Sequence, residues 1–208
     1  QRSGCTPAQL LEDTGLLDDH LIAAHCLYLD DADIARCGRA GIHVAHIPKG
    51  NATGGTAAPT SMLRRAGAAL ALGTDNMHAD MVEVLRWALA IGRIQEDGVD
   101  DFWQPEHVLR MGTMGGAQAM GLAGQIGSIE VGKQADLVAF DFRRAHLVPC
   151  VKPVGNLVHT AQGRDVEHVW VGGRQVVASG RPTQVDLDQI LADAQRAADA
   201  VWRRARGA

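Results

Sequence analysis

The chain has 208 residues, of which 46% are hydrophobic and 21% charged, with a formal net charge of -4. This composition excludes a disordered or fibrous protein, and the small negative charge gives no indication of a nucleic-acid partner. No apolar run reaches the roughly 18 residues that span a bilayer, and the first residues lack a secretory signal. We therefore expect no membrane partner and a cytoplasmic location, and four cysteines without a C-x-x-C pair favour reduced thiols.

The first residues already have the pattern of a folded segment. The chain begins with Gln1 rather than methionine, and Thr6-Pro7-Ala8-Gln9 supplies an N-cap, an N1 proline and an N3 glutamine. Leu10 and Leu11 follow, and a glycine at position 15 ends the predicted helix. We expect this chain to be the later part of a longer protein.

Three apolar runs then alternate with helical patterns. The apolar run within "HLIAAHC" ends at His25, and the run "IHVAH" ends at His46. The following "PKGNATGGTAAP" is expected to be a loop, and the third run, "AALALGT", leads to Asp75. Helical patterns follow these runs at residues 30–41, 60–67 and 79–98. Short, nearly continuous apolar runs between helices are typical of parallel strands buried on both faces, so the sequence predicts successive β/α units.

The polar residue at the end of each run predicts a functional edge of the sheet. The carboxyl ends of parallel strands meet at one edge, and in a (β/α)₈ barrel that edge carries the active site. His25, His46 and Asp75 are therefore candidate metal-binding or catalytic residues. The alternative is that the two histidines are core residues with satisfied hydrogen bonds and that Asp75 only caps the next helix.

The second half of the chain changes its periodicity. "QPEHVLRMGTMGGAQAMGL" predicts a helix, and the preceding loop "DDFWQP" offers Phe102 and Trp103 as either a lid or an oligomer contact. "GSIEVGKQADLVAFD" alternates as strands do, and "DVEHVWVGGRQVVASG" predicts a hairpin that turns at Gly172-Gly173. The last residues have the apolar spacing of an amphipathic helix.

The motifs "LIAAHCLYLDD", "HVAHIPKGN", "LRRAGAALALGTDN", "GGAQAMGL" and "IGSIEVGKQADLVAFD" together resemble the amidohydrolase superfamily. The branch they resemble is that of the cytosine, guanine, adenosylhomocysteine and s-triazine aminohydrolases. The resemblance implies an α/β fold: strands six to eight of a metal-dependent (β/α)₈ TIM-like barrel, part of a small β-sandwich, and a C-terminal helix. The corresponding domains are residues 1–122 for the partial barrel, 123–182 for the part of a composite sandwich, and 183–208 for the helix.

The resemblance also assigns roles to single residues. Asp75 matches the strand-eight aspartate that binds the metal and accepts a proton from its water, and His25 matches the strand-six histidine beside the metal. His46, Asn51, Asn76 and His78 are expected at the substrate. The alternatives are that Asn51 orders its loop and that Asn76 and His78 belong to a helix-capping turn. Lys49 departs from the family pattern, which has a small residue at this position in the His-x-Pro segment.

The family takes its other metal ligands from a His-x-His pair and a further histidine that this chain lacks. The resemblance therefore implies a divalent metal, Zn or Fe, whose remaining ligands lie in a missing N-terminal half, and a homo-oligomer is expected. The implied activity is hydrolytic deamination of a small nitrogen heterocycle, such as a purine, pyrimidine or s-triazine, through a metal-bound hydroxide. The alternatives are a cyclic amidase or imidazolonepropionase-like ring-opening hydrolase, or a non-catalytic half-barrel that docks on a partner subunit.

Overall fold

Three short parallel strands form the first sheet of the computed structural model, which describes residues 4–76 and 79–207. Strand β2 (His43–His46) lies between β1 (Ile22–Ala24) and β3 (Ala69–Leu72), and both pairings are parallel. The predicted succession of parallel β/α units is confirmed for these strands, and the chain is a mixed α/β protein.

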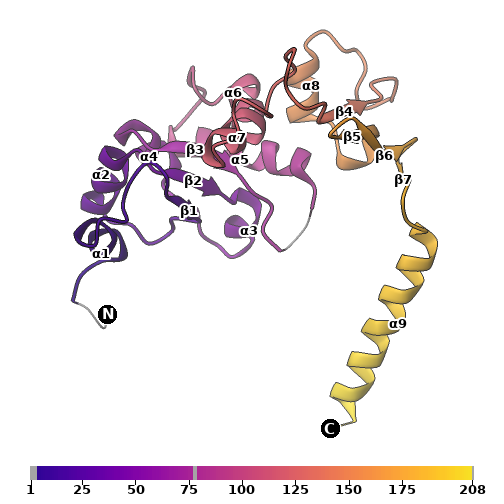
Figure 1. The fold of residues 1–208 in the computed structure, drawn as a ribbon, viewed down its shortest axis with the longest axis horizontal. Coiled ribbons are helices and arrows are strands. Elements are labelled where there is room, and N and C mark those ends of the chain that lie inside the picture. The colour runs from indigo at the N-terminus through magenta and orange to yellow at the C-terminus, as the bar shows by residue number, and fades with distance from the viewer. Residues whose placement is uncertain (1–3, 77–78, 208) are drawn as a thin grey trace. The chain divides into compact units, whose positions relative to one another are not determined.

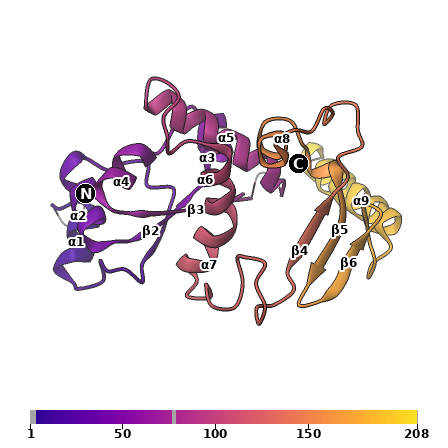
Figure 2. The ribbon, with the colours of Figure 1, turned by 90° about the horizontal axis from the view of Figure 1, so that it is seen from above.

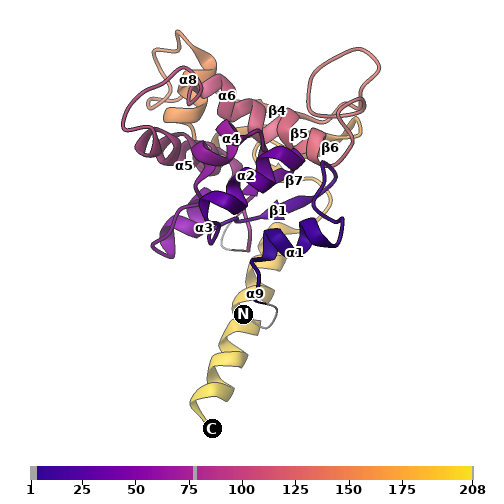
Figure 3. The same cartoon turned by 90° about the vertical axis from the view of Figure 1, so that its left-hand side faces the viewer.

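Local sequence signals account for the helices around this sheet. Thr6 caps the first helix by accepting the backbone N–H of Gln9, as predicted, and Asp30 caps the second helix in the same way. Gly67, at φ 114°, ends α4 in the left-handed conformation that favours glycine. Figures 1 and 3 show α1 beside α2. The helices are α1 (Pro7–Asp13), α2 (Asp31–Ala40), α3 (Pro48–Thr53), α4 (Thr60–Ala66) and α5 (Met81–Gln95).

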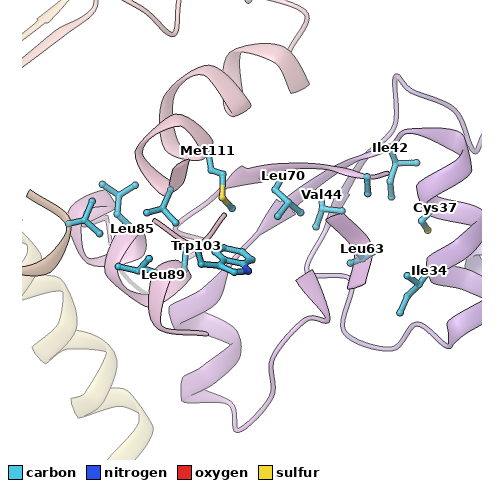
Figure 4. Packing of buried hydrophobic residues seen from close by; sticks show 14 of the residues in the cluster. Ile34, Cys37, Ile42, Val44, Leu63, Leu70, Leu85, Leu89, Trp103 and Met111 are labelled. Atoms are coloured by element: carbon cyan, nitrogen blue, oxygen red, sulfur yellow. The ribbon is translucent and has the colours of Figure 1, made fainter. Parts of the chain in front are cut away.

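The two faces of the sheet carry different side chains. Val44 and Leu70 lie in the buried cluster that the sheet shares with the helices. Figure 4 shows these two side chains between Leu63 and Leu85. Side chains alternate along a strand, so Ala24, Ala45 and Ala71 lie on the opposite face. That face therefore has only small side chains next to the carboxyl ends of the strands.

Trp103 lies in the core and not on the surface. Its side chain is 0% exposed, its indole Nε1 donates a hydrogen bond to Ser61 Oγ at 3.0 Å, and its ring lies against Gly92 of α5. The interpretation of Trp103 as a lid or an oligomer contact is therefore wrong, because both the indole ring and its N–H group are satisfied inside the protein.

The predicted helix after this loop contains an irregular turn. It consists of α6 (Pro105–Arg110), a π-helical turn η1 (Met111–Gly115) and α7 (Gly116–Ala119), and Figure 2 shows it beside β3. A Cβ at Gly115 would lie 2.6 Å from the Leu70 carbonyl oxygen, so glycine permits this close approach. Helix α8 (Pro153–His159) packs on α5 and α6, and Arg86 of α5 donates to the Val158 and His159 carbonyls.

The chain divides into two compact units, Gln1–Lys133 with Phe142–Gly163 and Gln134–Asp141 with Arg164–Ala208. These boundaries differ from the predicted ones at residues 122 and 182, since α8 packs within the first unit. The composite sandwich itself stays a prediction. The 3-10 turn η2 (Gly163–Asp165) spans the point in the sequence where the chain passes from the first unit into the second.

The second unit holds an antiparallel sheet and the last helix. Its elements are β4 (Leu137–Phe140), β5 (Val166–Val171), β6 (Arg174–Ala178), β7 (Arg181–Pro182) and α9 (Leu187–Arg206). The β5–β6 hairpin turns at Gly172 and Gly173, both at positive φ, as predicted. The C-terminal helix is also confirmed, although none of its residues is buried. Among the described residues, no helix has both the length and the apolar character needed to cross a membrane.

Candidate active site

His25 and Asp75 meet at the carboxyl edge of the parallel sheet. His25 directly follows β1, where its backbone N–H donates to the Ala45 carbonyl, and Asp75 follows β3 after Gly73 and Thr74. The distance from His25 Nε2 to Asp75 Oδ2 is 3.6 Å. Their side chains are 39% and 34% exposed, so both can be reached by a small molecule. The structure thus brings together the two residues predicted to be catalytic.

The backbone at this edge is strained. His25, Cys26 and Asp75 adopt left-handed conformations with φ of 64°, 53° and 56°. For residues other than glycine this region costs about 1 kcal/mol or more, and such strain is concentrated at functional sites. The left-handed turns direct His25 and Asp75 away from the regular path of their strands, so the sheet places both side chains at its edge.

Two asparagines lie next to His25 and Asp75, one of them buried and the other exposed. Asn51, on α3, is 5% exposed, and its Oδ1 lies 2.9 Å from His25 Nδ1. Asn76 is exposed, and its backbone N–H donates to Asp75 Oδ1 at 2.7 Å. The role of both as substrate contacts stays a prediction, and the corresponding prediction for His78 lies outside the described residues.

His46 is placed differently from His25 and Asp75. It is 0% exposed and lies on the Val44 side of β2, which faces the helices. Neither ring nitrogen has a hydrogen-bond partner among the described residues, and burial lowers the pKa of His46 to about 4. A neutral, enclosed imidazole on this side of the strand gives no support to the prediction that His46 contacts substrate.

His46 is expected to make the fold sensitive to acid. Its pKa is lower in the folded protein than the ordinary 6.5, so the unfolded chain binds more protons between about pH 6.5 and 4. Stability is therefore lost as the pH falls through this window, by at most about 1.4 kcal/mol per pH unit. Urea unfolding from pH 7.5 to 4.5 measures this slope, and His46→Leu should make it shallower. An unchanged slope in His46→Leu would contradict the burial of an uncharged ring.

An ion pair near the site was missed by sequence reasoning. Lys49 Nζ of α3 lies 2.5 Å from Glu83 Oε2 of α5. Lys49, a long basic residue where the family pattern has a small one, thereby joins α3 to α5. No periodicity in the sequence signals a partner 34 residues away.

The side chains of His25 and Asp75 offer ligand atoms that fit one side of a zinc or iron site. Asp75 Oδ1 accepts the Asn76 N–H, whereas Asp75 Oδ2 accepts no hydrogen bond from the described residues and faces His25 Nε2. A carboxylate oxygen and an imidazole nitrogen are suitable ligands for either metal, but a tetrahedral zinc site needs four. In the described part of the chain, the one cluster of three possible ligands is Asp18, Asp19 and His20. It precedes β1, at the opposite end of the strand, and is exposed.

The chain is similar to known proteins over most of its length. Residues 3–176 match the amidohydrolase family. The chain is 38% identical over 198 residues to a 5-methylthioadenosine/S-adenosylhomocysteine deaminase of Syntrophobacter fumaroxidans, covering 91% of this chain and 44% of that protein. The fold matches a zinc-bound adenosine deaminase from Xanthomonas campestris with a TM-score of 0.90 and 31% identity, over 97% of this chain and 47% of the other.

A second solved structure extends the likeness to another substrate class. It is a zinc-complexed atrazine chlorohydrolase from Arthrobacter aurescens, with a TM-score of 0.82, 27% identity, and coverage of 94% and 44% of the two chains. The chain belongs to the amidohydrolase family. It spans less than half the length of these relatives.

Proposed function

We propose that this chain carries the His25 and Asp75 part of the active site of a metal-dependent hydrolytic deaminase. The observation that carries the proposal is the approach of His25 Nε2 to Asp75 Oδ2 at the carboxyl edge of a parallel sheet, in a chain of the amidohydrolase family. Strands β1 to β3 then correspond to the last three strands of a (β/α)₈ barrel. The N-terminal half of the same enzyme supplies the other strands and metal ligands.

The proposed substrate is a purine nucleoside or a related heterocycle with an exocyclic amino group. Relatives named as deaminases of methylthioadenosine, adenosylhomocysteine and adenosine support this class. A related chlorohydrolase acts on atrazine, so the shared chemistry is displacement of a substituent from an electron-poor ring carbon by water. In the proposed reaction, water adds to the amino-bearing carbon, the C–N bond breaks, and the products are ammonia and the oxo heterocycle.

The two side chains have different roles in this proposed reaction. A bound Zn²⁺ or Fe²⁺ lowers the pKa of water and so supplies a nucleophile at neutral pH. Asp75 accepts the proton of the attacking water through its carboxylate and returns it to the departing nitrogen. His25, with Nε2 turned toward Asp75, stabilises charge that develops on the ring and orients the reacting carbon.

The test uses the assembled enzyme, meaning this chain together with the N-terminal half. Purified enzyme is assayed with methylthioadenosine, an s-triazine and a cyclic imide, by ammonia release and ultraviolet spectra, and its metal content is measured. Ammonia release with about one tightly bound Zn or Fe per site supports the proposal. Ring opening without ammonia favours the cyclic amidase, and a folded, metal-free, inactive assembly favours the structural half-barrel.

His25→Ala is expected to lower turnover by roughly 10²- to 10³-fold, the usual cost of removing a group that stabilises developing charge. The side chain is partly exposed, so the melting temperature should change little. Steady-state kinetics and thermal unfolding measure the two effects. A purely thermal defect, with normal turnover at low temperature, would instead make His25 a structural residue.

A further inference from the structure

The Asn51 side chain is buried and contacts His25. Its side chain is 5% exposed, and its Oδ1 lies 2.9 Å from His25 Nδ1. Its amide nitrogen is buried without a partner among the described residues. A substrate that reached this amide would have to displace the imidazole, because the side chain has almost no free surface.

The backbone that carries Asn51 is held in place on several sides. Its N–H donates to the Ile47 carbonyl at 3.1 Å, and its own carbonyl accepts from Gly54 and Thr56 at 3.1 and 3.0 Å. The ion pair between Lys49 and Glu83 joins the same helix to α5. The Asn51 amide is therefore a fixed point next to a histidine that lies on a loop.

His25 needs such a fixed point. It lies just beyond the end of β1 with a left-handed backbone, and 39% of its side chain is exposed. Asn51 contacts one ring nitrogen, and the other nitrogen faces Asp75 at 3.6 Å, which is longer than a hydrogen bond. Without the Asn51 contact, the ring would be free to occupy its other staggered rotamers.

We propose that Asn51 is a positioning residue that acts through His25: it holds Nδ1 so that Nε2 faces Asp75 and the substrate. This inference rests on the function proposed above, since it requires His25 to take part in the reaction. It replaces the expected role of Asn51 as a substrate contact, because the amide group is buried and its oxygen already contacts His25 Nδ1.

A double-mutant cycle in the assembled enzyme tests this role. Asn51→Ala and Asn51→Leu should lower kcat by about 10- to 100-fold with KM changed less than about threefold, because the reacting groups are misplaced while substrate still binds. In a His25→Ala background, Asn51→Ala should cost no further activity. Thr53→Ala is the matched control on α3, because its hydroxyl bonds only carbonyls of that helix, and it should retain normal kcat.

The outcomes separate the two proposals. Additive losses in the double variant, or a large rise in KM for Asn51→Ala, overturn the positioning role while the deaminase proposal stands. Normal turnover in His25→Ala overturns the assignment of His25 itself. Nitrogen-15 spectra of the enzyme labelled at histidine give a readout that needs no turnover: the His25 Nδ1 resonance should shift in Asn51→Leu and not in Thr53→Ala. An unshifted resonance in folded Asn51→Leu also overturns the positioning role.

Discussion

Asp75→Asn should lower turnover by roughly 10³- to 10⁴-fold in the assembled enzyme, with no loss of fold. The amide has the size of the carboxylate, and its oxygen can still accept the Asn76 N–H that Asp75 Oδ1 accepts now. Asparagine also tolerates the left-handed backbone found at position 75. What disappears is the negative charge, and with it both the proposed proton acceptor and the proposed anionic metal ligand.

Three measurements on Asp75→Asn distinguish these losses: ammonia release, metal content and melting temperature. Asp101→Asn is the matched control, because Asp101 is exposed and lies in the loop before α6. Activity within tenfold of the parent for Asp75→Asn would rule out the proposed role of this carboxylate. A collapsed melting temperature would instead make it a structural residue.

Gly92→Ala should destabilise the first unit by about 3 kcal/mol, at the upper end of the cost of overpacking a core. A Cβ at this position would lie 2.0 Å from Trp103 Cδ2 and 2.3 Å from Cε2, far inside van der Waals contact. The indole ring is 0% exposed and is tied to Ser61, so it has no free space to move into. The strain outweighs the gain of up to about 1 kcal/mol that alanine brings to a helix interior.

Urea unfolding followed by tryptophan fluorescence measures this change. Gly116→Ala is the matched control, since Gly116 is also helical and a Cβ there meets no atom within 4 Å. Gly116→Ala should be neutral or slightly stabilising. Equal stability of Gly92→Ala and Gly116→Ala would contradict the tight packing of the indole ring on α5.

Elements determined by local signals were predictable from sequence. Thr6 caps its helix as the pattern indicated, and the hairpin turns at Gly172 and Gly173. These structures depend on residues within a few positions of one another. The short helix α3 was expected to be a loop, because three glycines in "PKGNATGGTAAP" obscured the N1 proline at position 48.

Contacts between distant segments were not predictable. The partners of Asn51 and Lys49 lie 26 and 34 residues away, and the indole N–H of Trp103 reaches an oxygen 42 residues away. The burial of His46 did have a signal in the sequence: it is two residues from Val44 and therefore on the same face of the strand. The apolar character of that face indicated a neutral core histidine.

The left-handed backbone at His25 and Asp75 limits which amino acids can occupy these positions, apart from any chemistry. Valine and isoleucine, branched at Cβ, are poorly suited to positive φ, whereas glycine and asparagine adopt it readily. In a saturation library at either position, soluble expression should therefore rank variants by backbone tolerance, while activity ranks them by the functional group. The two rankings would differ most for asparagine, which is favourable for the turn but cannot act as a base.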